Sequence, residues 1–483
     1  MDWMEQLEPQ AVFSHFYKLC EIPHGSYNID QISDYLYGFA KSLKLWCKQD
    51  EYKNVLIRKP ATEGYENEPA ILLQGHMDMV AVKEEGCPLD LEKDGLDLAY
   101  EEGYLYAKGT SLGGDDGIAL AYAMAILAAD DIPHPALEVL FTVNEEVGMD
   151  GAIGVDLSDF SAKRLLNIDS EEEGILLAGC AGGTRVQAFF EENRTQTEGL
   201  LWKIALRDFQ GGHSGADIHK WRGNAICVLA RCLDMLTEDV SLQLVSLEGG
   251  EKDNAIPRFA QALVCVPKDA EEIFLSSFAE IEKELLGEFI DREPKMKFFC
   301  EKQELVAPIC AFSKDTSARI FALLASVFDG VISMSAKLSG IVETSLNLGV
   351  VTTDGDGVRA VFALRSSKKS AKDYLAKRLQ NLITVFGASV KRSGDYPAWE
   401  YRAVSPLREK MVRIYKEQYG CEPEVTVIHA GLECGILLEK KPELDAISFG
   451  PDILDIHTTR ERLDVMSVER TWNYILAVMA DKE

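Results

Sequence analysis

Two neighbouring acids, Glu145 and Glu146, follow an apolar run in the segment FTVNEEVGM at residues 141–149. Consecutive side chains of a strand point to opposite faces, so two adjacent carboxylates at a strand end are expected to have different roles. One could bind a metal ion while the other moves protons as a general base. The pair alone does not say which acid has which role.

A second group of candidate residues also follows apolar runs. His76 and Asp78 are two positions apart in GHMDMV, so on a strand they share a face, and the carboxylate could orient an imidazole that binds metal. Alone, this spacing is more typical of a hydrogen-bonded surface pair. Asp169 directly follows the run LLNI. These positions are the carboxyl ends of predicted strands, where open α/β sheets bind their ligands.

Two further segments supply candidates from outside the strands. Asp115 and Asp116 lie in the glycine-rich turn SLGGDDG before an apolar helix. An N-cap explains Asp116 well, but it leaves the glycines around Asp115 unexplained. His457 lies in a loop, GPDILDIHTTRERL, before the last predicted helix.

Together these residues place many acids at one end of a single predicted sheet, and so many acids cannot all stay ionised without a strong positive charge. Two divalent cations would supply it, held by two imidazoles and three carboxylates, one of them bridging. Donors without thiolate suit Zn²⁺, with Mn²⁺ or Co²⁺ as competitors. The set is His76, Asp78, Asp115, Glu145, Glu146, Asp169 and His457.

The elements that must position this set alternate between strand-like and helical patterns over the first 185 or so residues. That order predicts an α/β domain with a largely parallel central sheet. The predicted strands are 53–59, 70–80, 136–144 and 164–169, and the helices include 7–20 and 116–130.

The middle of the chain has a different sequence pattern, with longer strand-like runs between helices. It is predicted to be an inserted α+β lid. After Tyr396-Pro397 the α/β pattern returns, with helices at 405–418 and 466–481. The predicted layout is a discontinuous catalytic domain of residues 1–186 and 398–483 with a lid and substrate-binding domain at 187–397.

Composition limits the class of protein. The chain has 483 residues, 47% of them hydrophobic, so more than one domain is expected. Its formal net charge of -29 makes nucleic acid and anionic membranes poor partners. The acidic start MDWMEQLEPQ is unlike a secretory signal, and no apolar stretch is long enough to span a membrane. Eleven scattered cysteines without CxxC pairs favour reduced thiols, and all this predicts a cytoplasmic protein.

The motifs as a whole resemble the dizinc aminopeptidase/carboxypeptidase/aminoacylase clan, and within it the bacterial cytosolic aminoacyl-histidine (beta-alanyl-histidine or non-specific) dipeptidases. The resemblance spans the whole length in the family's order. It is carried by the segments GHMDMV, GTSLGGDDGIA, NEEVGMDGA, NIDSEEEG, GGHSGADI, DNAIPR, HAGLECG and GPDILDIHTTRERL.

The resemblance implies a role for each candidate. One zinc would be held by His76, Asp115 and Asp169, and the other by Asp115, Glu146 and His457, with Asp115 bridging. Asp78 would support His76, and Glu145 would be the general base. The family usually has Asp-Asn, joined by a cis peptide, where this chain has Asp115-Asp116, so the hydrogen bonding of Asp116 is a departure.

Residues of the predicted lid would complete the site. The resemblance assigns oxyanion binding to His213 in GGHSGAD and leaves open whether it acts within its own chain or across a homodimer. For the substrate α-carboxylate it points to Asn254 and Arg365, with Arg258 as another candidate, and ordinary strand-end polarity explains these residues equally well. Glu433 in HAGLECG could bind the substrate ammonium or cap a helix.

The sequence therefore predicts a metallodipeptidase acting on unblocked dipeptides, including Xaa-His, with metal-activated water and Glu145 as base. A deacylase or tripeptidase of the same clan would share the metals and differ in lid contacts. A protein of another class, a catalytically inactive metal-binding scaffold, would be expected to lose Glu145 first, and Glu145 is present.

Overall fold

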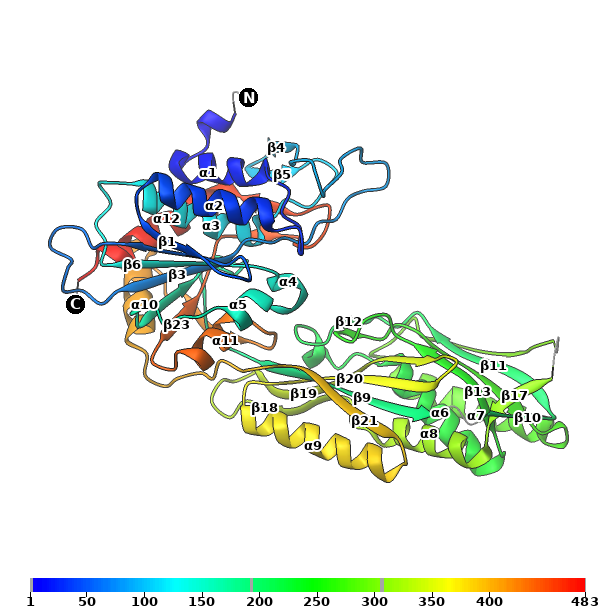
Figure 1. Ribbon diagram of the computed structural model, residues 1–483. Coiled ribbons are helices and arrows are strands. Elements are labelled where there is room, and N and C mark those ends of the chain that lie inside the picture. Colours follow the sequence, from blue (N-terminus) through cyan, green and yellow to red (C-terminus); the bar gives the residue numbers. More distant parts are fainter. Residues whose placement is uncertain (1–2, 192–193, 305–307, 483) are drawn as a thin grey trace. The chain divides into compact units, whose positions relative to one another are not determined.

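The computed structural model describes residues 3–191, 194–304 and 308–482, which form two compact units (Figure 1). Unit 1 contains the described residues up to Gly179, then Trp399–Val427, and those from Leu432 onward. Unit 2 contains Cys180–Ala398 and Ile428–Gly431. Unit 1 is therefore discontinuous in sequence.

An eight-stranded sheet forms the centre of unit 1. Its four middle strands, β6, β3, β7 and β23, pair in parallel, while β1, β2 and β6 pair antiparallel at one edge. The prediction of a mixed α/β fold with a mostly parallel central sheet is confirmed. In spatial order the strands are β1 (Trp46–Gln49), β2 (Val55–Lys59), β6 (Leu137–Thr142), β3 (Ile71–His76), β7 (Arg164–Asn167), β23 (Asp445–Ser448), β8 (Ile175–Cys180) and β22 (Glu424–Ile428).

Burial on both faces explains why the middle strands are continuous apolar runs. Every residue of β3 and β6 is buried, as expected of parallel strands covered by helices on both sides. One face, with Ile71 and Leu73 of β3, shares a core with five helices. These helices are α1 (Gln10–Cys20), α2 (Asp30–Ser42), α3 (Gly114–Ala128), α10 (Pro406–Tyr419) and α12 (Val465–Ala480).

The parallel register brings the strand ends together. His76, the last residue of β3, pairs with Thr142, the last residue of β6. Asn167 ends β7 opposite Gln74 of β3. The loops that follow these strands therefore leave the sheet along one edge, as the sequence predicts.

The strand predicted at 136–144 is too long at its carboxyl end. Strand β6 stops at Thr142, Asn144 has a left-handed backbone (φ 54°), and Glu145 begins the short helix α4 (Glu145–Gly148). The argument from strand alternation for Glu145 and Glu146 is therefore wrong. Their side chains diverge because consecutive helical residues differ in direction by about 100°.

Unit 2 is built on a second sheet whose registered strand pairs are all antiparallel. Strands β13 and β19 meet at the single registered pair Gly249–Val351, which links a group of four strands to a group of five. Its path is β16 (Lys297–Lys302), β11 (Leu200–Arg207), β15 (Ala260–Val266), β13 (Gln243–Gly249), β19 (Val342–Thr353), β20 (Gly357–Ser366), β9 (Gly182–Glu191) and β21 (Ser389–Tyr396), and β18 (Gly330–Met334) also pairs with β19.

Four helices share the core of this sheet: α6 (Ala225–Asp239), α7 (Glu271–Phe289), α8 (Lys314–Ser326) and α9 (Lys369–Val385). In the part of the chain that the structure describes, no helix of either unit is both long and apolar enough to cross a membrane.

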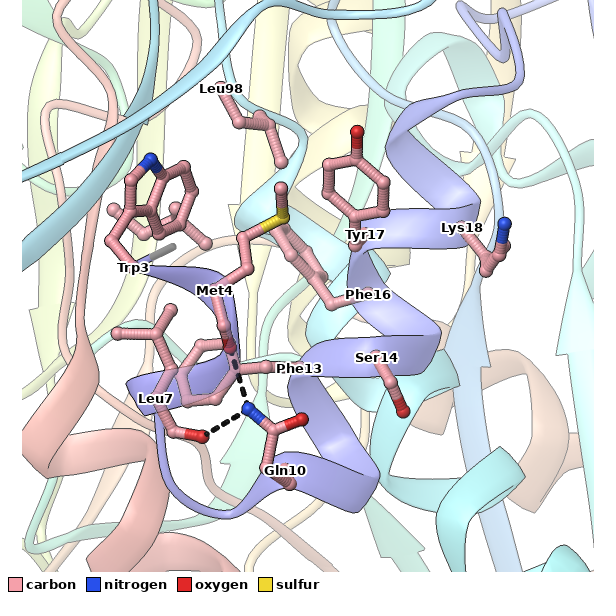
Figure 2. A pocket seen from close by; sticks show the side chains of 11 residues that line it. Trp3, Met4, Leu7, Gln10, Phe13, Ser14, Phe16, Tyr17, Lys18 and Leu98 are labelled. Carbon is pink, nitrogen blue, oxygen red and sulfur yellow. Dashed lines mark hydrogen bonds between the residues drawn. The ribbon is translucent and has the colours of Figure 1, made fainter. Parts of the chain in front are cut away.

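Unit 1 contains an apolar cavity of about 200 Å³ beside α1 and the hairpin of β4 (Leu98–Glu101) and β5 (Tyr104–Ala107) (Figure 2). Phe16 lines this cavity and also packs on the first turn of α3, where a Cβ at Gly117 would lie 3.2 Å from its ring. The glycine thus lets α1 approach the helix that carries Asp115.

Candidate metal centre

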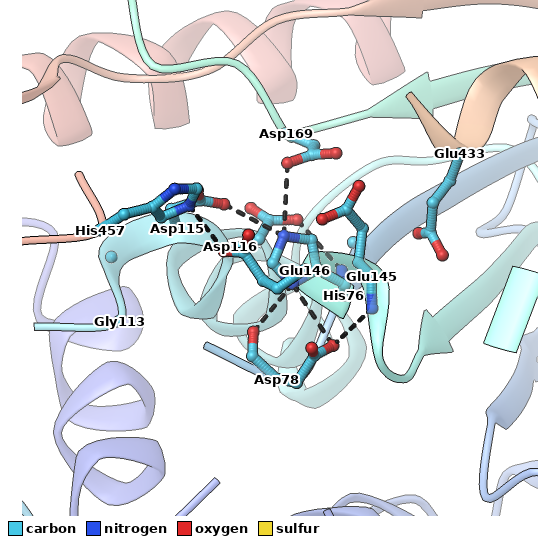
Figure 3. Close-up of polar contacts among 12 residues, drawn as sticks. His76, Asp78, Gly113, Asp115, Asp116, Glu145, Glu146, Asp169, Glu433 and His457 are labelled. Carbon is cyan, nitrogen blue, oxygen red and sulfur yellow. Dashed lines mark hydrogen bonds and ion pairs between the residues drawn. The ribbon is translucent and has the colours of Figure 1, made fainter. Parts of the chain in front are cut away.

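His76 is buried within the cluster of candidate metal ligands (Figure 3). Its side chain is 1% exposed, and Nδ1 lies 2.9 Å from the backbone oxygen of Asp78. A carbonyl oxygen can only accept, so Nδ1 carries the proton and the lone pair of Nε2 is free to bind a metal. Nε2 faces Asp115 Oδ1 at 3.1 Å and Asp169 Oδ1 at 3.5 Å.

The Asp115 carboxylate lies between two imidazoles. Oδ1 is 3.1 Å from His76 Nε2, and Oδ2 is 3.1 Å from His457 Nε2. His457 Nε2 also lies 2.8 Å from Glu146 Oε1. One carboxylate that offers a separate oxygen to each of two ligand groups has the arrangement of a bridging ligand.

Three groups of side chains bring possible ligand atoms within 4.8 Å of one another. Asp116, and not Asp115, completes the group of His76 and Asp169. The other two groups are His76, Glu145 and Glu146, and Asp115, Glu146 and His457.

Asp116 is not the helix cap that the sequence suggested. Gly113 is the N-cap of α3, and Asp116 is buried, with Oδ2 accepting from the backbone N–H of His76 at 3.2 Å. The peptide bond between Asp115 and Asp116 is cis. Asp116 thus stabilises, through this hydrogen bond, the end of the strand that carries His76.

The balance of charge fits divalent cations. Burial alone would lower the pKa of His76, but the carboxylates of Asp115 and Asp169 outweigh it and raise this pKa well above its usual value. Burial likewise opposes protonation of His457, yet Asp115 and Glu146 raise its pKa to about 10. Asp169 Oδ2 is buried without a hydrogen-bond partner among the described residues. The donors and their surplus negative charge therefore suit bound metal.

Asp78 contacts the cluster differently from the expectation. Its carboxylate lies 3.8 Å from His76 Nδ1, and its backbone oxygen orients the imidazole instead. Oδ1 accepts from the backbone N–H of Glu145 at 3.0 Å, and Oδ2 accepts from Ser26 Oγ at 2.8 Å. Asp78 therefore fixes the first residue of α4, and Ser26, in a loop with no recognisable motif, supports it.

Glu433 begins helix α11 (Glu433–Lys440) and is fully buried. Oε2 accepts from Gln74 Nε2 at 2.5 Å and from Thr142 Oγ1 at 2.6 Å, while Oε1 has no partner within the described ranges. Burial raises the pKa of its carboxyl to about 7. No sequence motif marks Thr142, whereas a polar glutamine inside the apolar run AILLQ is a signal for Gln74.

His213 lies in unit 2, on the two-residue strand β12 (Gly212–His213), which pairs with β14 (Ala255–Ile256). Its Nδ1 accepts from the backbone N–H groups of Gly215 at 3.3 Å and Ala216 at 3.1 Å. The two backbone donors to Nδ1 are closer than Arg365 Nη2, which lies 3.5 Å from Nε2, so the neutral ring is assigned its proton on Nε2. Nε2–H is then a hydrogen-bond donor, as an oxyanion ligand requires.

His213 is expected to remain neutral down to about pH 4. Burial and the Arg365 guanidinium lower its pKa to about 4, against the weaker opposing effect of Asp217. The unfolded chain keeps the usual value of 6.5, so it binds more protons between these pH values, and folding stability falls as the pH drops through that window. NMR titration of the histidine rings, with His213→Gln to assign the signal, measures this pKa. A midpoint near 6.5 would contradict the burial of this ring.

The other expected lid residues also lie in unit 2. Arg365, the second-last residue of β20, is buried. Its Nη1 donates to Tyr396 Oη at 3.1 Å, and its Nη2 lies 3.5 Å from His213 Nε2. Asn254 is exposed, and its backbone oxygen accepts from Ser214 N–H at 2.8 Å. Arg258 Nε donates to Phe209 O at 3.4 Å. The structure thus groups His213 with Arg365 in unit 2 and the acidic cluster with Glu433 in unit 1.

A parallel sheet with imidazoles and carboxylates gathered at its carboxyl edge is the arrangement of a metal-dependent hydrolase. The model of Peptidase family M20/M25/M40 matches residues 72–481, and the chain belongs to this family, whose peptidases are metal-dependent. The resemblance drawn from the motifs is confirmed.

Individual relatives are consistent with this family assignment. The cytosol non-specific dipeptidase of Escherichia coli (strain K12) is 37% identical over 484 residues, covering 100% of this chain and 99% of that protein. The aminoacylhistidine dipeptidase structure from Vibrio alginolyticus has a TM-score of 0.89 and 35% identity, covering 99% of this chain and 98% of that one. Aminopeptidase PepT from Bacillus cereus ATCC 10987, at 16% identity and TM-score 0.56 with 98% of both chains covered, shares the fold.

Proposed function

We propose that this protein is a metal-dependent dipeptidase that hydrolyses unblocked dipeptides, including Xaa-His. The observation that carries the proposal is the Asp115 carboxylate between His76 and His457, 3.1 Å from each, with Glu145 at the same edge of the sheet. The dipeptidases from Escherichia coli and Vibrio alginolyticus, which match over nearly the whole chain, support it.

The proposal assigns two divalent cations to the cluster, with zinc preferred over manganese or cobalt because the donors are imidazole and carboxylate. His76, Asp115 and Asp169 would hold one ion, and Asp115, Glu146 and His457 the other. When bound, such ions acidify a water molecule and polarise the scissile carbonyl. Asp116 lies close enough to His76 and Asp169 to require a test against Asp115.

Glu145 is the proposed general base. It takes a proton from the attacking water as the new C–O bond forms, and then passes that proton to the leaving amine as the peptide C–N bond breaks. Burial and the neighbouring carboxylates raise its pKa well above the usual value in the metal-free chain, whereas the His76 charge lowers it. Asp78 holds the backbone of Glu145 in place. His213, with its donor Nε2–H, is assigned to the developing oxyanion.

The remaining assignments concern the two ends of the substrate and the setting of the enzyme. Arg365 and Asn254 are assigned to the α-carboxylate, and Glu433 to the ammonium. Residues 187–397 are assigned to the lid, and 1–186 and 398–483 to catalysis. A cytoplasmic location and a homodimer complete the proposal, and light scattering after gel filtration measures the assembly.

Substrate preference distinguishes the candidate functions of this site. The purified protein is expected to hydrolyse Ala-His with a kcat/KM at least ~10²-fold above that for tripeptides or N-acetyl-histidine, because buried groups that bind charged termini are left unpaired by blocked or longer substrates. Removal of metal with a chelator abolishes the activity, and Zn²⁺ restores it. Preference for N-acetyl-histidine would indicate a deacylase, preference for tripeptides a tripeptidase, and metal binding without hydrolysis a scaffold.

A further inference from the structure

A carboxylate outside the proposed ligand set binds the loop that presents Asp115. Glu461 is 2% exposed and accepts four consecutive backbone N–H groups. Oε2 accepts from Leu112 at 2.7 Å and Gly113 at 3.0 Å, and Oε1 accepts from Gly114 at 2.8 Å and Asp115 at 3.3 Å. A carboxylate that satisfies four donors fixes the path of a loop that otherwise lacks regular hydrogen bonds.

The glycines of SLGGDDG make this contact possible. Gly113 has φ 70°, and a Cβ there would lie 2.8 Å from Met79 Sδ. A Cβ at Gly114 would lie 3.3 Å from Glu461 Oε1. These positions let successive N–H groups converge on one anion, which explains the glycines that an ordinary helix cap leaves unexplained.

Glu461 also belongs to the loop of His457. Its backbone N–H donates to Thr458 O at 3.3 Å, and Arg460 N–H donates to Thr458 Oγ1 at 3.1 Å. One end of this short loop therefore carries His457, and the other end binds the segment of Asp115. The two loops are far apart in the sequence, and their carboxylate and imidazole meet at 3.1 Å.

We infer that Glu461 is a positioning residue for the metal centre, holding the Asp115 loop and the His457 loop in the register that both ions need. Its carboxylate accepts backbone N–H groups and is not one of the proposed metal ligands. The inference rests on the proposed metal centre, but its test measures metal binding and does not depend on dipeptidase activity.

The test is Zn²⁺ affinity of the metal-free protein, measured by chelator competition, for wild type and Glu461→Gln. Loss of a residue that orients metal ligands typically costs 10–100-fold, so affinity is expected to fall about 10–100-fold. With Co²⁺ bound, the visible absorption bands are expected to shift because the ligand geometry changes. At saturating metal, kcat is expected to recover most of its wild-type value.

Glu138→Gln is the matched control. Glu138 is also buried and accepts backbone N–H groups, from Ser161 at 2.7 Å and Ala162 at 2.9 Å, but it lies at the opposite end of β6 from the cluster. It is expected to lower thermal stability without changing Zn²⁺ affinity or the Co²⁺ spectrum. Wild-type affinity in Glu461→Gln, or equal losses in both variants, would overturn the inference.

Gly114→Ala provides a milder change should Glu461→Gln fail to fold. The added methyl group approaches Glu461 Oε1 at 3.3 Å, and a smaller loss of Zn²⁺ affinity is expected. Unchanged affinity in this variant would likewise count against the inference. If all variants bind metal as expected but no peptide is cleaved, the proposed function fails and the positioning role stands.

Discussion

Glu145→Gln is expected to lower kcat for Ala-His by about 10²–10⁴, the usual contribution of a general base, while the protein keeps its full metal content. Glutamine preserves the shape of the side chain, and the backbone N–H of Glu145 can still donate to Asp78 Oδ1. The loss therefore isolates proton transfer. Steady-state kinetics on unblocked dipeptides, with metal content measured by mass spectrometry on the same sample, provides the result.

Metal content decides between two roles for this residue, because Glu145 has an oxygen close enough to His76 and Glu146 to be a ligand itself. Loss of an ion from Glu145→Gln would make it a ligand, and full activity would exclude it as the base. Asp150→Asn is the control, since it removes the same charge five residues further along, at the exposed start of α5 (Asp150–Gly154). It is expected to keep the wild-type kcat.

Asp115→Asn is expected to abolish the binding of both ions at micromolar metal and to reduce hydrolysis to background. An amide lacks the charge that two cations need, and it offers a single oxygen where Asp115 offers one to His76 and another to His457. The affinity should fall by more than the ~10–100-fold caused by loss of a supporting residue. Isothermal titration of the metal-free protein with Zn²⁺ measures both sites.

Asp116→Asn is the control for this variant and resolves which neighbour bridges. The asparagine oxygen can still accept from His76 N–H, as Asp116 Oδ2 does, so metal binding and activity are expected to stay within a few-fold of wild type. Burial and the charge of Asp169 raise the pKa of Asp116 well above its usual value. The substitution therefore removes a carboxyl group whose ionised form the fold already disfavours. Retained metals in Asp115→Asn and loss in Asp116→Asn would reverse the assignment.

The central sheet and much of the cluster could be predicted because parallel strands leave a strong pattern. Runs such as AILLQ and LLNI are buried on both faces, and each ends where polar side chains begin. The rule that such strands present ligands at their carboxyl ends then placed His76 and Asp169 together. The antiparallel sheet of unit 2 left only a general α+β pattern, because its two groups of strands pair over long distances in sequence.

Local geometry could not be predicted because it depends on single backbone torsions and on distant partners. The left-handed Asn144 ends β6 early and turns Glu145 into a helix. The path of the chain after His76 decides that a backbone oxygen, and not the Asp78 carboxylate, meets the imidazole. Glu461 looks like one more charge in HTTRERLD, and the amides that it binds lie 346–349 residues away.

The position of β23 gives this enzyme an order of assembly during its synthesis. Strand β23 lies between β7 and β8, although it is synthesised after every residue of unit 2. At ~5–20 residues per second, the roughly 260 residues between β8 and β23 take on the order of 13–50 s to translate. Through that interval the first part of unit 1 has an incomplete sheet, while unit 2 can already fold. A nascent chain can therefore complete its central sheet only after β23 has been synthesised.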